Sequence, residues 1–86
     1  MTKFHELTML EQALLTTIVN LEVEFEESNY TCCWCDVAFW AKMMKVKANV
    51  IKGILSSLNQ KGLITSDGQD VFFSSECSAM LREKFE

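Results

Sequence analysis

The chain has 86 residues, of which 49% are hydrophobic and 23% charged, and its formal net charge is −4. This length allows one domain, expected to span residues 1–86, and the composition is that of a folded protein and not of a disordered chain. No apolar run approaches the roughly 18 residues that cross a membrane, and the first residues lack a signal-peptide layout. We therefore expect a cytoplasmic protein.

The charges are distributed unevenly along the chain. Residues 1–30 carry a net charge of −5 and residues 66–86 a net charge of −3. Residues 31–65 carry five lysines and one aspartate, which gives a net charge of +4. Because a local basic stretch is what contacts phosphates, the acidic total does not exclude nucleic-acid binding.

The first predicted element is a helix that begins after Thr8. Thr8 and Glu11 form a T-x-x-E capping box, in which the hydroxyl and the carboxylate satisfy amides of the first turn. The helix is expected to end between residues 26 and 29, and a short strand is expected within residues 30–34. Apolar residues at steps of three and four predict the buried stripe: Leu10, Leu14, Ile18, Leu21 and Phe25, widened by Leu15 and Val19.

Two further helices are predicted, one from residue 35 or 36 to residue 45 and one over residues 48–61, with a short turn between them. Asp36 suits the dipole of the first of these helices, and Gly62 is a typical residue beyond the end of the second. Their inward residues recur at helical spacing: Val37, Trp40, Ala41 and Met44, then Ile51, Ile54, Leu55 and Leu58.

A hairpin and a last helix complete the predicted order. Residues 63–65 and 71–73 are β-prone and flank a segment that contains Asp67-Gly68, and Asp-Gly is a strong hairpin signal in such a place. Ser74 or Ser75 is expected to cap the last helix. The predicted fold is mainly α with a small β wing, in the order α-β-α-α-β-β-α.

A hairpin directly after two helices that meet across a tight turn is the order of winged helix-turn-helix proteins. The segments Trp40-Ala41-Lys42-Met43-Met44-Lys45-Val46-Lys47 and Leu58-Asn59-Gln60-Lys61-Gly62-Leu63-Ile64 resemble the DNA-binding core of MarR-like regulators. That core reads L-A-x-x-L-x-[VIL] and then L-x-x-K-G-L-I, and the resemblance covers roughly residues 36–75. It implies a winged helix-turn-helix fold and DNA-binding transcription regulation. The chain departs from the pattern at Lys47, where Ser or Thr usually caps the helix, and at its acidic hairpin tip.

The helix over residues 48–61 is the candidate DNA-reading element. Asn can pair with adenine, Ser with either base, and Lys with guanine or phosphate. A mid-helix glycine costs roughly 1 kcal/mol relative to Ala, which suits close approach by DNA or a partner. The outward residues of this helix are Asn49, Lys52, Gly53, Ser56 and Asn59 or Gln60. The turn before it adds Lys42, Lys45 and Lys47, where flanking phosphates would lie. We predict a regulator that reads the major groove of double-stranded DNA, as a homodimer that doubles a short site.

An alternative function is a protein–protein interaction module or a small inhibitor protein that does not bind DNA. The whole chain is acidic, and Asp67 and Asp70 lie at the hairpin tip, where they would repel phosphate. Trp34, Phe39 and Met43 form an apolar partner patch if they are exposed together, and part of the core if they are buried.

Three of the four cysteines are crowded at Cys32, Cys33 and Cys35. A zinc site would need two ligands beyond the C-x-x-C pair, and a redox role would need a thiol of lowered pKa, such as Cys35 near a helix N-terminus. Packed, inert thiols are the default interpretation. We predict no metal, no cofactor and no enzymatic activity, because His5 has no catalytic pairing and there is no phosphate-binding glycine loop.

Overall fold

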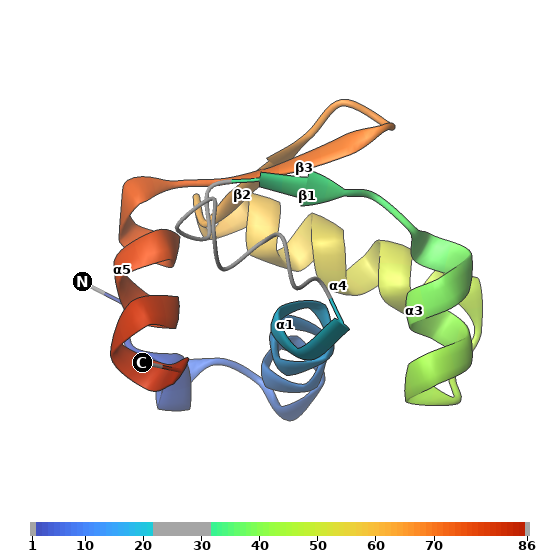
Figure 1. Cartoon of the computed structure of the whole chain (residues 1–86), viewed down its shortest axis with the longest axis horizontal. Coiled ribbons are helices and arrows are strands. Elements are labelled where there is room, and N and C mark those ends of the chain that lie inside the picture. The colour runs from blue at the N-terminus through green and yellow to red at the C-terminus, as the bar shows by residue number, and fades with distance from the viewer. Residues whose placement is uncertain (1, 22–31, 86) are drawn as a thin grey trace.

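The computed structural model describes residues 2–21 and 32–85, which form a mainly helical fold with a small three-stranded antiparallel sheet (Figure 1). In chain order, the described elements are η1 (a 3₁₀ helix, Phe4–Glu6), α1 (Met9–Leu21), β1 (Cys32–Trp34), α3 (Val37–Met44), α4 (Ala48–Gln60), β2 (Ile64–Ser66), β3 (Asp70–Phe73) and α5 (Ser75–Phe85). Figure 1 shows α4 between the sheet and α1, with α3 at one end of the molecule and α5 at the other.

The capping box at the start of α1 is confirmed. The amide of Thr8 donates to the carboxylate of Glu11 at 2.9 Å, and the amide of Glu11 donates to the hydroxyl of Thr8 at 3.1 Å. The predicted stripe is wrong at Leu10, which is 48% exposed, because Glu11 takes the inward position of the first turn. The buried residues of α1 are Glu11, Leu14, Leu15, Ile18 and Val19. Phe25 and the expected helix end lie outside the described residues.

The sheet has the strand order β1-β3-β2, and both pairings are antiparallel. The predicted strands 63–65 and 71–73 are displaced slightly, to Ile64–Ser66 and Asp70–Phe73. Alternation along the strands places Cys33, Ile64, Val71 and Phe73 in the core. The carboxylate of Asp67 accepts the amides of Gln69 and Asp70 at 2.9 and 2.8 Å and thereby builds the turn of the hairpin.

The ends of α4 and α5 follow the local signals. Gly62 has a φ of +75°, and the amide of Leu63 next to it donates to the carbonyl of Leu58 at 3.0 Å. This is the αL ending that glycine permits. Of the two predicted capping serines, it is Ser74 whose hydroxyl accepts the amide of Cys77, at 3.2 Å.

A buried carboxylate ties α1 to α4. Glu11 is 1% exposed, and its two oxygens accept the ammonium of Lys61 and the hydroxyl of Ser57, both at 2.6 Å. Burial by itself raises the pKa of Glu11, but the hydrogen bonds from Lys61, Ser57 and Thr8 outweigh it and lower the pKa to about 2. The carboxylate is therefore ionised at neutral pH and fully occupied.

We expect the substitution Glu11→Gln to reduce the free energy of unfolding by about 2–3 kcal/mol, because it removes the buried charge that Lys61 and Ser57 face. The surface pair of Lys3 and Glu83, 3.8 Å apart and half exposed, supplies the control. Glu83→Gln should change stability by less than about 0.5 kcal/mol. Urea unfolding followed by circular dichroism measures both, and equal effects of the two substitutions would contradict a special role for Glu11.

The same carboxylate predicts a pH dependence of stability. Because folding lowers the pKa of Glu11 from 4.5 to about 2, its contribution is complete above about pH 4.5 and is lost as the pH falls toward 2. The difference in unfolding free energy between the parent protein and Glu11→Gln should therefore shrink over that interval. A constant difference between pH 6 and pH 2, measured by urea unfolding at each pH, would contradict this assignment.

Candidate nucleic-acid interface

A tight turn joins α3 to α4 and sets the direction of both helices. Asp36 begins α3, and its carboxylate accepts the amide of Phe39 at 3.1 Å. At the other end, Lys45 adopts the left-handed conformation with φ 59° and ψ 42°, and the amide of Val46 donates to the carbonyl of Ala41 at 3.0 Å. Lys47 precedes α4 without any capping bond from its side chain. The turn therefore forms through its backbone, which leaves the lysine side chains pointing outward.

The residues predicted to contact DNA are all exposed, and they lie around this turn and on the outer side of α4. They are Lys42, Lys45, Lys47, Asn49, Lys52, Gly53 and Ser56. The inner side of α4 is held in the core by Ile51, Ile54 and Leu58. Between residues 37 and 66 the sequence contains no Asp or Glu. The outer side of α4 is therefore polar, with lysine as its one charged residue type.

The structure divides the α4 residues between two grooves. A groove of about 560 Å³ runs between α4 and the hairpin, with Lys52 and Ser56 on the α4 side and Ser66 and Gly68 on the hairpin side. Two partly buried apolar residues, Val37 and Leu55, also line it. Gly53 lies on the other flank of α4, in a smaller groove beside α1. Asn49, in the first turn of α4, lines neither groove.

Sequence reasoning counted Lys61 in the basic stretch but missed its role. Lys61 forms an ion pair with Glu11, which neutralises the positive charge of Lys61 within the protein. No ion pair among the described residues involves Lys42, Lys45, Lys47 or Lys52. The positive charge that remains exposed is thus concentrated where α3 meets α4. The missed contact joins residues 50 positions apart, and nothing local in the sequence signals it.

The acidic hairpin tip has a structural explanation. The two backbone amides that the carboxylate of Asp67 accepts, from Asp70 and Gln69, lower its pKa. The charge that builds the turn therefore persists at neutral pH. Phosphate contact at this tip is unfavourable, so the hairpin is the weaker side of the candidate interface.

The three residues of the partner patch are all exposed. Phe39 is 42% exposed and Met43 is 48% exposed, and their spacing of four residues places them together on α3. Trp34 is 69% exposed and lies on the outer face of the sheet. Because Trp34 pairs with Asp70 and Cys32 with Phe72, the exposed ring of Phe72 is its diagonal neighbour. Trp34 therefore lies near Phe72 on the exposed face of the sheet, and Phe39 and Met43 lie one turn apart on α3.

The C-x-x-C segment lies in extended backbone. The amide of Cys35 donates to the carbonyl of Gln69 at 2.8 Å and so prolongs the pairing of β1. Extended residues three apart have Cα atoms roughly 10 Å from each other, too far for a disulfide between Cys32 and Cys35. Burial raises the pKa of Cys77 to about 12. Among the described residues, no three His, Cys, Asp or Glu side chains are grouped so that they could hold a metal ion.

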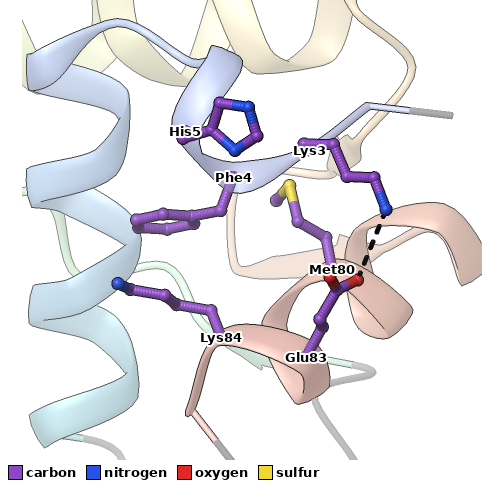
Figure 2. A pocket seen from close by; sticks show the side chains of 6 residues that line it. All are labelled: Lys3, Phe4, His5, Met80, Glu83 and Lys84. Atoms are coloured by element: carbon purple, nitrogen blue, oxygen red, sulfur yellow. Dashed lines mark ion pairs between the residues drawn. The ribbon is translucent and has the colours of Figure 1, made fainter.

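A further cavity of about 280 Å³ lies between η1 and α5 (Figure 2). The rings of Phe4 and Phe85 meet edge to face at 5.7 Å, and the ammonium of Lys84 lies 5.5 Å from the centre of the Phe4 ring. The ammonium of Lys3 is 3.8 Å from the carboxylate of Glu83. Both lysines that line the cavity therefore have partners within the chain: Lys3 pairs with Glu83, and Lys84 lies over the ring of Phe4. These contacts hold the N-terminal segment against α5.

Comparison with protein-family models, curated proteins and solved structures found no match. Within residues 2–21 and 32–85, no helix combines the length and the apolar composition that crossing a membrane requires.

The conformation of Lys45 makes a prediction about stability. A side chain in the left-handed region costs about 1–2 kcal/mol that glycine avoids, so we expect Lys45→Gly to stabilise the fold by about 0.5–1 kcal/mol. Lys42→Gly is the matched control, because it places the same change inside α3, where glycine costs about 1 kcal/mol. Thermal or urea unfolding should shift in opposite directions for the two variants. Destabilisation by both would contradict the left-handed assignment at Lys45.

Proposed function

We propose that this chain is a winged helix-turn-helix protein that binds double-stranded DNA and regulates transcription, with α4 in the major groove. The observation that carries the proposal is the surface where α3 meets α4. It combines a polar helix face with four exposed lysines that form no ion pair with any described residue, and no acidic residue lies between positions 37 and 66. Phosphate contacts at the edge and polar contacts in the centre are the usual division of labour at DNA.

The fold supports this proposal. Two helices that meet across a tight turn are followed directly by a hairpin, and β1 completes the sheet on the other side of β3. In a winged helix-turn-helix protein the second of those helices enters the major groove, and the turn lies near the backbone. In this chain the second helix is α4, and the turn carries Lys45 and Lys47.

The side chains on α4 suit contact with base edges. Asn49, Lys52 and Ser56 are spaced by three and four residues, so that they share one side of the helix. Asparagine makes paired hydrogen bonds to adenine, and Lys52 suits guanine or a phosphate. Because one such helix contacts few bases, we propose a homodimer that occupies two half-sites. Sedimentation that shows only monomer at tens of micromolar would remove the dimer from this proposal.

A protein-interaction module is the second candidate function. The exposed pair of Phe39 and Met43 favours it, because aromatic and methionine side chains are enriched in the cores of protein interfaces. The net charge of −4 also opposes the approach to DNA at long range. In this alternative the protein, as an adaptor or a small inhibitor, binds its partner through α3.

Salt dependence distinguishes the two functions. If the four exposed lysines each neutralise a phosphate, the logarithm of the affinity for duplex DNA should fall with the logarithm of salt concentration with a slope of about −3 to −4. Lys52→Ala should reduce that slope by about one. Arg82→Ala removes a positive charge from α5, at the other end of the molecule, and should leave the slope unchanged. Fluorescence anisotropy over a salt series measures all three proteins.

Two outcomes would favour the interaction module instead. One is the absence of binding to random duplex at low salt and at protein concentrations above roughly 10⁻⁴ M. The other is equal loss of DNA affinity in Arg82→Ala and Lys52→Ala, which would indicate a general charge effect. Replacing Phe39 and Met43 by serine should leave the DNA affinity nearly unchanged, whereas it should abolish binding to a protein partner.

A further inference from the structure

A shallow groove of about 260 Å³ lies between the first turn of α1 and the middle of α4. Leu10 comes from α1, and Val50, Gly53 and Ile54 come from α4, so that carbon atoms make up most of its lining. We propose that this groove receives the 5-methyl group of a thymine and gives the protein a preference for A·T pairs at that position. The inference rests on the proposed DNA-binding function and names the base that it selects.

Gly53 leaves the groove open. A Cβ atom built at this position meets no atom within 4 Å, and the residue is not among those with a positive φ. Neither packing against residues 2–21 and 32–85 nor the backbone conformation therefore requires glycine here. The missing side chain provides space that opens to the outside of α4, where an incoming group can approach the helix backbone.

The groove borders the side of α4 that carries Asn49. Asn49 and Gly53 are four residues apart, so at about 100° per residue they lie one turn apart and within about 40° of each other around the helix. The amide of asparagine suits adenine, and the thymine of such a pair displays its methyl group in the same major groove. A helix placed so that Asn49 reaches an adenine thus brings Gly53 and Val50 toward a neighbouring thymine methyl.

The groove lacks a positive charge that could hold a phosphate. No lysine lines it, and the carboxylate of Glu11 in its lining is buried and ion-paired with Lys61. A phosphate would therefore lose water without gaining a cation, whereas a methyl group would be in contact with carbon. Leu10 is 48% exposed at the rim, so its apolar surface is free to lose water when the methyl group arrives.

Replacement of thymine by deoxyuridine tests the proposal, because it removes only the methyl group. The probes are an alternating A·T duplex, the same duplex with deoxyuridine for every thymine, and an alternating G·C duplex, all at one low salt concentration. We expect the parent protein to bind the deoxyuridine duplex about fourfold more weakly for each contacted thymine. Binding is measured by fluorescence anisotropy.

Two variants locate the contact. Gly53→Ala fills the open space and Leu10→Ala removes part of the rim, so both should reduce the ratio of the two affinities toward one. Arg82→Ala is the control and should keep the ratio of the parent protein. Thermal unfolding should show that Gly53→Ala is folded and at least as stable as the parent, since alanine favours a helix over glycine.

The outcomes separate this inference from the function on which it rests. Equal affinities for the thymine and deoxyuridine duplexes would overturn the methyl contact and leave DNA binding intact. An undiminished ratio in both Gly53→Ala and Leu10→Ala would overturn the placement in this groove. Failure to bind any of the duplexes at low salt would overturn the proposed function itself.

Discussion

The arrangement of α1 and α4 depends on the hydrogen bonds that the buried carboxylate of Glu11 accepts. This carboxylate accepts the amide of Thr8 within its own helix, and the hydroxyl of Ser57 and the ammonium of Lys61 across the interface. A buried charge is tolerated only when its hydrogen bonds are satisfied, and this one has a partner on each side. Its position in the first turn of α1 therefore fixes where α4 crosses α1 and which side of α4 remains outside.

This pairing also decides which lysines are available for other contacts. Lys61 is neutralised by Glu11, so the basic charge of residues 31–65 that remains for other contacts lies on α3, in the turn and in the first half of α4. The turn itself keeps a lysine in the left-handed conformation, where glycine would be more stable. At the hairpin, by contrast, the negative charge of Asp67 is required by the backbone of the turn. The charges of Asp67 and Lys61 are thus used by the fold itself, whereas the exposed lysines of the turn and of α4 are not needed for it.

The features that the sequence predicted correctly are those that a few neighbouring residues determine. The Thr8–Glu11 capping box, Gly62 after α4 and the Asp-Gly hairpin are local, because each hydrogen bond spans five residues or fewer. Leu10 was misassigned because the periodic pattern counts apolar residues, and the inward position belongs to a glutamate whose partners are 46 and 50 residues away. The sequence also could not decide whether Phe39 is exposed or buried, since this depends on which elements pack against α3.

For the candidate site, too, the sequence predicted what depends on local residues and missed what depends on tertiary contacts. Outward positions on α4 follow from the helical period once the apolar side is known, so the exposure of Asn49, Lys52 and Ser56 was predicted correctly. The separation of Gly53 from Lys52 into different grooves was not predictable, because it depends on α1 and the hairpin lying on opposite flanks of α4. The neutralisation of Lys61 depends on the same tertiary contact between α1 and α4.

The two candidate functions use different sides of the molecule and meet only at α3. At about 100° per residue, Lys42 lies about 60° around α3 from Phe39 and about 100° from Met43. A protein bound to that apolar pair would crowd Lys42, whereas Asn49 and Ser56 on α4 would remain accessible. Such a partner would weaken the salt-dependent part of DNA binding and leave the base contacts in place. Under the proposed DNA-binding function, a partner on α3 would therefore act through the phosphate contacts, without competing for the side of α4 that is proposed to contact bases.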